Sequence, residues 1–172
     1  AESRARSLLR SPGGEGRFGG RCAVRRLETT LNRDPNLCQL MWQQREIENY
    51  LCTRAVLLAY AKHLGRAQLG DLFAATAESH MAAAIDEVSE ALRTLSRPDP
   101  FGSDIKASDE FLDPVFRKFF SKMGLPEATM RKTDYHMLAP FLTKEAIPSE
   151  VVHKLDAIVE VALRAGPTDG GE

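Results

Sequence analysis

The stretch QLGDLFAATAESHMAAAIDEVSEALRTLSR, residues 68–97, decides the fold class of this 172-residue chain. Apolar side chains recur along it every three or four residues, which is the spacing of one face of an α-helix. The following segment, SRPDPFGSD at residues 96–104, ends the repeat because its prolines and glycine favour turns. We predict one long helix whose core-facing side chains are Leu69, Leu72, Phe73, Ala77, Met81, Ala84, Ile85, Val88, Leu92 and Leu95.

Three further helices are predicted after residue 104. In the segment 108–125, Ser108 or Asp109 can cap a helix whose first turn contains Pro114. Its aromatic face is assigned to the core and consists of Phe116, Phe119 and Phe120. A short helix in the segment 133–144 carries Tyr135, Leu138 and Leu142. The last helix begins near Pro148, ends at Gly166-Pro167, and is expected to face the core with Val151, Val152, Leu155, Ile158, Val159, Ala162 and Leu163.

Upstream of residue 68, the pattern changes from strand to helix. LCQLMW, residues 37–42, carries no charge and is short enough for a buried strand. The segment 46–65 predicts one or two helices, with Thr53 as the cap of the second and Gly65 as its end. The predicted fold is therefore mainly α, with five to six helices and one or two short strands. Because a single strand forms no sheet alone, we expect this chain to be the later part of a larger α/β unit.

Composition and charge divide the chain into three parts: a flexible basic arm over 1–20, a mostly helical domain over 21–165 and a disordered tail over 166–172. Residues 1–26 contain seven arginines and two glutamates, a formal charge of +5 in a chain whose net charge is −1. No apolar run reaches the roughly 18 residues of a transmembrane helix, so no membrane contact is expected. The three cysteines form no CxxC pair, which predicts reduced thiols and a cytoplasmic location.

Motifs for nucleotide, zinc or serine-hydrolase chemistry do not occur in the sequence: there is no GxxxxGK[ST], HExxH or GxSxG. The remaining candidates are the carboxylates of REIENYL, residues 45–51. On a helix, Glu46 and Glu48 would diverge by about 200°, so at most one could face a shared centre with Arg45. Acidic residues are also common in the first turn of a helix, where they interact favourably with the helix dipole.

WQQREIENYL, residues 42–51, together with the segment 111–160, resembles the Toprim-like C-terminal region of OLD-type (overcoming-lysogenisation-defect) ATP-dependent nucleases and related AAA/ABC-type ATPases. The resemblance covers roughly residues 37–163. It implies a fragment of a metal-dependent DNA endonuclease in which Glu48 lies nearest the metal and Glu46 is the second choice. Lys132 would neutralise charge on the scissile phosphate. The implied ion is Mg²⁺ or Mn²⁺, and the implied partner is an ATPase/Toprim chain or a second copy.

The sequence departs from that family because it contains no Asp-x-Asp pair and no phosphate loop. We therefore expect the isolated chain to bind no metal and to be inactive. An alternative is a non-catalytic helical protein-interaction module with a basic arm. A third interpretation is a small DNA-binding protein that contacts nucleic acid through Arg21, Arg25 and Arg26.

Overall fold

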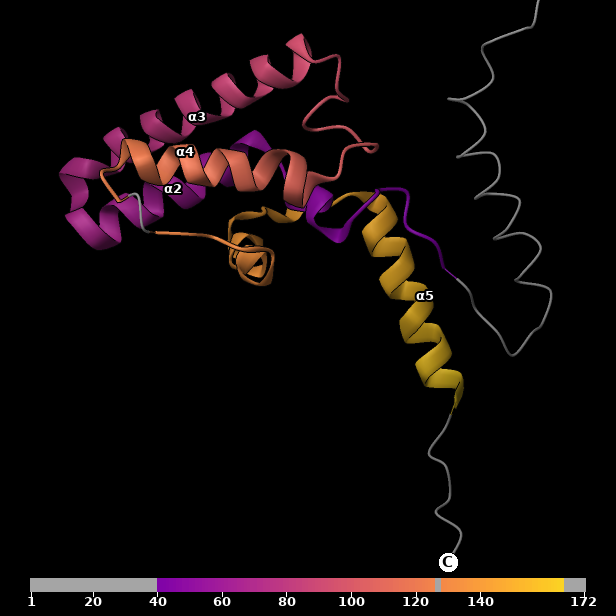
Figure 1. Cartoon of the computed structure of the whole chain (residues 1–172). Helices are drawn as coiled ribbons and strands as arrows, with labels where there is room; N and C mark the ends of the chain where they lie inside the picture. Colours follow the sequence, from indigo (N-terminus) through magenta and orange to yellow (C-terminus); the bar gives the residue numbers. More distant parts are fainter. Residues whose placement is uncertain (1–39, 126–127, 166–172) are drawn as a thin grey trace, which may run out of the picture. The chain divides into compact units, whose positions relative to one another are not determined.

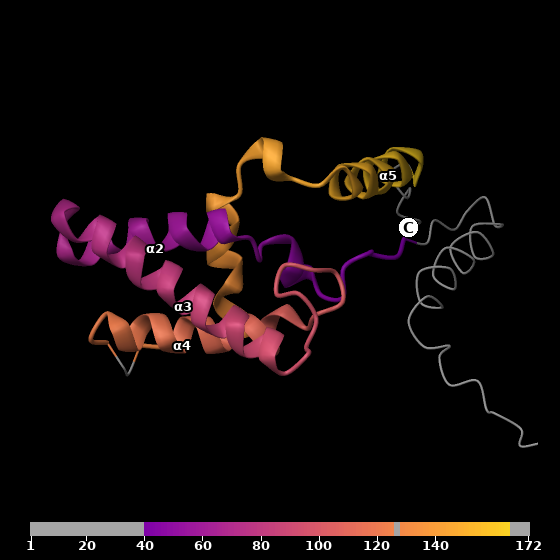
Figure 2. The same ribbon diagram turned by 90° about the horizontal axis from the view of Figure 1, so that it is seen from above.

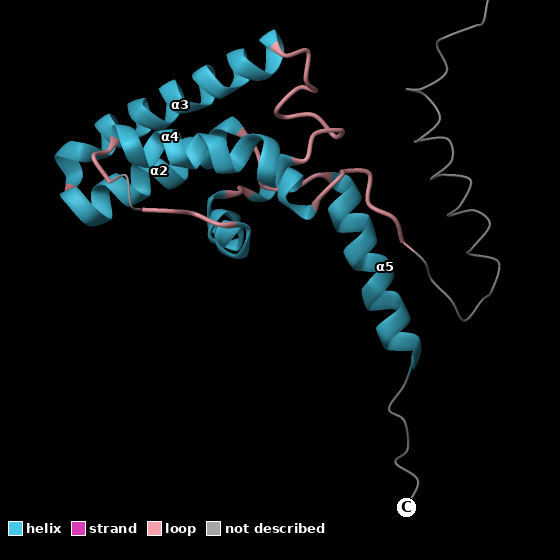
Figure 3. Cartoon of the chain, viewed as in Figure 1, coloured by secondary structure: helices cyan, strands magenta, loops and turns pink. Residues whose placement is uncertain are grey.

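The computed structural model describes residues 40–125 and 128–165, and the compact unit formed by these residues begins at Trp42. The predicted arm, the tail and the three arginines Arg21, Arg25 and Arg26 lie outside the described residues. Within them, the prediction of a mainly α fold is confirmed (Figures 1 and 3). The elements are η1 Ile47–Tyr50, α2 Arg54–Leu69, η2 Asp71–Phe73, α3 Ala74–Thr94, the π-helical turn η3 Ala107–Leu112, α4 Asp113–Lys122, η4 Lys132–Phe141, η5 Lys144–Ala146 and α5 Ser149–Ala165.

Helix α2 begins as predicted but ends later. Its cap is Thr53, whose hydroxyl accepts a hydrogen bond from the Val56 amide at 3.2 Å. The predicted stop at Gly65 is wrong, because the helix continues to Leu69 and ends at Gly70, which has a positive φ of 88°. Gly65 instead provides room for the α2–α3 contact: a Cβ atom at this position would lie 2.6 Å from the Cβ of Ala77.

The single helix predicted for residues 68–97 is interrupted at its start. Gly70 separates α2 from the short turn η2, and α3 starts only at Ala74. The centre of the predicted apolar face is buried in α3, but its ends are not. Leu72 is 85% exposed, Leu95 is 70% exposed, and Phe73 is also exposed. These three assignments to the core were wrong, since residue spacing alone does not show where a neighbouring helix stops covering the apolar face of α3.

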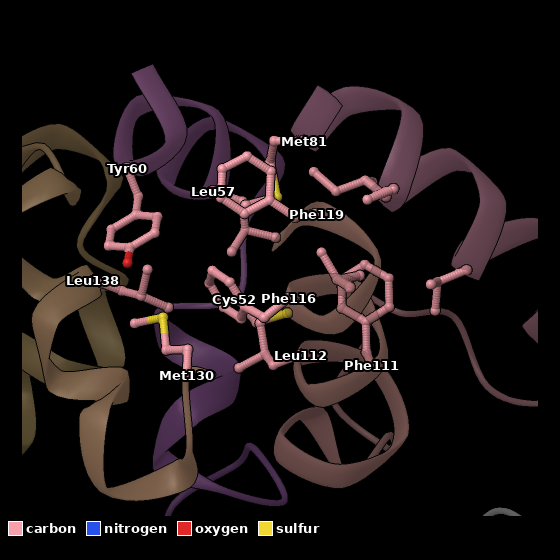
Figure 4. Close-up of a cluster of buried hydrophobic side chains, with 14 of the residues drawn as sticks. Cys52, Leu57, Tyr60, Met81, Phe111, Leu112, Phe116, Phe119, Met130 and Leu138 are labelled. Carbon is pink, nitrogen blue, oxygen red and sulfur yellow. The ribbon is translucent and has the colours of Figure 1, made fainter. Parts of the chain in front are cut away.

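The core lies where α2, α3 and α4 pack side by side and η4 closes one side (Figures 1, 2 and 4). Pro114 lies in the first turn of α4, and its three phenylalanines are buried, as predicted. Tyr135 of η4 stacks on Phe116 with ring centroids 6.0 Å apart, and its hydroxyl donates a hydrogen bond to Asp113. Cys52 is a free, buried thiol, and burial raises its pKa to about 12.

The predicted strand over residues 37–42 is not found in its described part. Leu40, Met41 and Trp42 have irregular backbone, and residues 37–39 lie outside the described ranges. No strand occurs among residues 40–125 and 128–165 (Figure 3). The side chain of Trp42 is 38% exposed and packs edge-on against Tyr50. Trp42, at the end of this segment, therefore packs against an aromatic ring of the helical unit and not within a sheet.

The structure contradicts the prediction that α5 packs into the core. No side chain from Ser149 to Arg164 is buried. Of the side chains predicted to face inward, Val151 is half-buried and the others are exposed: Val152 is 45%, Leu155 52%, Ile158 50% and Val159 54% exposed. In two views, the helix lies apart from α2, α3 and α4 (Figures 1 and 2). The amphipathic pattern was read correctly as a helix, but the surface that covers its apolar face was assigned wrongly.

We expect Gly65→Ala to destabilise the chain by about 1–3 kcal/mol, although alanine normally favours helix over glycine. The new Cβ would meet the Ala77 Cβ at 2.6 Å and the Phe73 carbonyl oxygen at 3.0 Å, and neither atom can move alone. Urea unfolding at neutral pH measures the change. Gln68→Ala, at an exposed position of the same helix, is the control and should be close to neutral. Equal stability of Gly65→Ala and the wild type would contradict close α2–α3 packing here.

Candidate functional site

Glu46 connects three segments that are far apart in the sequence. One carboxylate oxygen accepts hydrogen bonds from the Ser108 amide at 3.0 Å and the Ser108 hydroxyl at 2.8 Å. The other lies 2.8 Å from the ammonium group of Lys132. Its main-chain amide donates to the Asn49 side chain, which in turn donates to the carbonyl of Ile105. Glu46 therefore holds the start of η1, the turn η3 and the start of η4 together.

Both candidate carboxylates reach Lys132, which the helical spacing did not predict. Glu46 precedes η1 and has extended backbone, with φ −135° and ψ 159°, so the expected divergence of about 200° does not apply. Glu48 lies two residues further on, in the first turn of η1, with its carboxylate 3.7 Å from the Lys132 ammonium. The structure thus brings together the three predicted residues, with Lys132 closer to Glu46 than to Glu48. Their catalytic and metal-binding roles stay predictions.

The charges of this cluster are mutually compensated. Burial alone would raise the pKa of Glu46, but the hydrogen bonds from Lys132 and Ser108 outweigh it and hold this pKa below its usual value. The hydrogen bond to Glu46, aided by the nearby charge of Glu48, raises the pKa of Lys132. A carboxylate that accepts from the amide and the hydroxyl of Ser108 and from an adjacent ammonium group has the geometry of a structural ion pair.

The described residues do not form a metal site at this position. Among residues 40–125 and 128–165, no three His, Cys, Asp or Glu side chains come close enough to hold an ion. The Lys132 ammonium lies beside both carboxylates, and the oxygens of Glu46 are already hydrogen-bonded. Mg²⁺ and Mn²⁺ require several oxygen ligands, so Glu46 and Glu48 in this arrangement do not fit either ion.

A second cluster attaches α5 to the rest of the unit through Glu150. One oxygen of its carboxylate accepts a hydrogen bond from the Tyr50 hydroxyl at 2.6 Å, and the other accepts one from the Gln43 amide at 2.8 Å. Burial and the bond to Glu150 raise the pKa of Tyr50 to about 12, so the hydroxyl remains a donor at neutral pH. Lys154, one turn after Glu150, lies 3.5 Å from it and 5.6 Å from the centre of the Trp42 ring.

The attachment determines which side of α5 faces solvent. Glu150, Lys154 and Ala157 follow the spacing of one helix face and are all half-buried. The apolar stripe occupies another side of the helix, and its members are exposed: Val152, Leu155, Ile158, Val159, Ala162 and Leu163. We call this set the α5 stripe. A helix attached through Glu150 and Lys154 thus leaves the α5 stripe exposed.

An open depression beside the start of α2 contains several arginines but has compensated charges. Arg54 lies 2.6 Å from Asp86, and Arg97, which also lines the depression, lies 2.7 Å from Glu110. Phe101 and Pro100 form part of the wall. Because these guanidinium groups are paired within the chain and exposed, the depression lacks the unpaired positive charge that would favour an anionic ligand.

Reasoning from the sequence missed two features of these candidate sites. Ser108 was one of two candidate helix caps, with Asp109, but its hydroxyl donates to Glu46 across 62 residues of sequence. Nothing in the local sequence indicates this partner. The α5 stripe was recognised as apolar and assigned to the core, because periodicity identifies an apolar face without identifying its cover. The sequence carried one signal that polar contacts attach α5 to the rest of the unit. This signal was Glu150, an acidic residue on the side of the helix that is half-buried in the structure.

We expect Glu46→Gln to lower the free energy of unfolding by on the order of 1–2 kcal/mol at pH 7, because the variant loses its ion pair with Lys132 and weakens the bonds from Ser108. Since folding lowers the pKa of Glu46, its stabilisation is complete above the unfolded value of about 4.5 and is lost as pH falls through the folded value. Urea unfolding at pH 7 and pH 3 should therefore show a difference between wild type and variant that shrinks in acid. The control is Glu145→Gln, at an exposed position. A constant difference at both pH values would contradict the ion pair.

Comparison with known proteins adds no family or fold assignment. No protein-family model, curated protein or solved structure matches the chain. Within residues 40–125 and 128–165, no helix combines the length and the apolar character needed to cross a bilayer. We therefore infer a function from side-chain geometry, with the Glu46–Lys132 cluster and the α5 stripe as the two candidate sites.

Proposed function

We propose that this chain is a non-catalytic helical interaction module that binds a protein partner through the α5 stripe. The observation that carries the proposal is the orientation of α5: polar contacts from Glu150 and Lys154 hold the helix, while its apolar side chains remain exposed. A contiguous apolar surface on one helix face is typical of a protein-binding site. The core of α2, α3, α4 and η4 is closed without α5 and serves as the platform.

Burial of the stripe would contribute substantial free energy. Complete burial of a Val, Leu or Ile side chain contributes roughly 1.5–3 kcal/mol. Val152, Leu155, Ile158 and Val159 are about half exposed, so covering them would add roughly 1 kcal/mol each. Helices in proteins gain most of their stability from packing of an amphipathic face. A partner helix on the stripe would supply that packing.

The charges around the stripe favour a protein over a lipid surface. The exposed polar residues of α5 include Asp156 and Glu160 as well as Arg164, so the polar face is not predominantly basic. Helices that lie on anionic membranes usually carry Lys and Arg on the polar face. Mixed charge beside an apolar stripe is common at helix–helix contacts, where it contributes to the choice of partner.

A second candidate, a piece of an OLD-like metal-dependent endonuclease, is favoured by one observation. Glu46, Glu48 and Lys132, the three residues that the resemblance names, lie together, with both carboxylates within 4 Å of the Lys132 ammonium. In this second proposal a partner chain would supply further carboxylates and displace Lys132 from the pair. Sequencing the transcript upstream tests it: an in-frame Asp-x-Asp pair and phosphate loop would support it, and a stop codon directly upstream would contradict it.

Site-specific photo-crosslinking tests the interaction module. With p-benzoylphenylalanine at position 155, irradiation of the native cells should give a discrete covalent adduct, because Leu155 lies in the centre of the stripe and is 52% exposed. The matched control places the same residue at position 153, which is exposed on the polar side of the same helix. The adduct should be absent there.

The result at position 155 decides the proposal. A discrete adduct at 155 that is missing at 153 supports a protein partner on the stripe. Equal or no crosslinking at both positions contradicts it. Thermal unfolding of both substituted chains should match the wild type, since neither side chain belongs to the core.

A further inference from the structure

We propose that the partner on the α5 stripe is a second copy of this chain, paired through a parallel two-helix contact. This inference rests on the proposed function and specifies its partner. The stripe contains a run with alternating spacings of three and four residues: Val152, Leu155, Val159 and Ala162. That is the a–d–a–d spacing of a heptad seam. The seam places valine at both a positions and leucine at the first d position, a combination that favours two strands when the coiled coil is parallel.

The positions beside the seam also favour a parallel pair. In a parallel pair, a g residue of one helix approaches the e residue five positions further along the other. Ile158 is at a g position and would approach Leu163 of the second copy. This contact is apolar on both sides and widens the buried surface. Both side chains are exposed in the single chain, at 50% for Ile158 and 79% for Leu163.

An antiparallel pair of the same helices would place like charges together. Asp156, at an e position, and Glu160 lie on the same flank of the stripe and are exposed. In an antiparallel pair, e positions lie beside e positions, so the flanks that carry Asp156 and Glu160 in the two copies would face each other. Like charges in close contact are destabilising. A parallel pair separates the flanks to opposite sides of the seam.

The attachment of α5 leaves the seam accessible to a second helix. The body contacts α5 on the side of Glu150 and Lys154, away from Leu155 and Val159. A second α5 on the stripe would therefore not displace the bonds that hold the first. Because the two copies would use the same surface, the contact closes as a symmetric dimer and leaves no stripe open for further addition.

Sedimentation velocity of the full chain over a wide concentration range tests self-association. The wild type should shift from monomer to dimer as concentration rises. Leu155→Lys should raise the dissociation constant at least tenfold, because it places a charge in the seam. Leu72→Lys is the matched control: Leu72 is 85% exposed outside α5, and its replacement should leave the dissociation constant unchanged. Circular dichroism confirms that each variant is folded.

Disulfide trapping tests the parallel orientation. In a chain with Cys22→Ser and Cys38→Ser, Val159→Cys should form a covalent dimer on mild oxidation, because equal a positions face each other only in a parallel, in-register pair. His153→Cys, on the polar side, should remain monomeric. A dimer that depends on Leu155 but is not trapped at 159 overturns the parallel arrangement.

The outcomes also separate this inference from the proposed function. A wild type that remains monomeric at every concentration overturns self-pairing. If position 155 then gives a photo-adduct whose mass is not twice that of the chain, the interaction module stands with another partner. If no adduct forms either, both proposals fail.

Discussion

The hydrogen bond between the Tyr50 hydroxyl and Glu150 orients helix α5 and thereby exposes the surface that we propose binds a partner. It is 2.6 Å long and connects the first helical turn of the described unit to the first turn of its last helix. With the Gln43 amide and the Lys154–Trp42 contact, it holds the side of α5 that carries Glu150 and Lys154 against the body. Rotation of the helix to bury its stripe would break these bonds and remove the Tyr50 and Gln43 donors from the Glu150 carboxylate, which is costly for a partly buried charge.

The core and α5 are separate in energetic terms. The buried side chains of α2, α3, α4 and η4 form one cluster to which α5 contributes none of the described members. The Glu46 carboxylate secures this cluster at its edge by joining η1, η3 and η4. The stability of the body therefore depends on packing and on the Glu46 cluster, whereas the position of α5 depends on a few polar contacts. This division suits a rigid platform with an exposed binding helix.

Local patterns in the sequence predicted the helices but not the partners of their faces. The Thr53 cap, the Pro114 start and the buried phenylalanines of α4 all follow from short-range chemistry. Gly65 was misread because a glycine that ends a helix and one that admits a neighbouring helix look alike in sequence. Glu46, Glu48 and Lys132 were named as candidates and lie together, but Ser108 was not linked to them. The contact spans 62 residues, and no local signal encodes it. The α5 stripe was assigned to the core because an apolar helix face has the same residue spacing whether it packs in the core or is exposed.

Methyl-labelled nuclear Overhauser spectroscopy of the dilute chain tests the orientation of α5 most directly. We expect contacts between the Trp42 ring and the Lys154 methylenes, and none between the methyl groups of Leu155 or Val159 and core side chains such as Phe116 or Leu138. Overhauser contacts from the Leu155 or Val159 methyls to those core side chains would contradict this orientation, because the stripe would then be part of the core and unable to bind a partner.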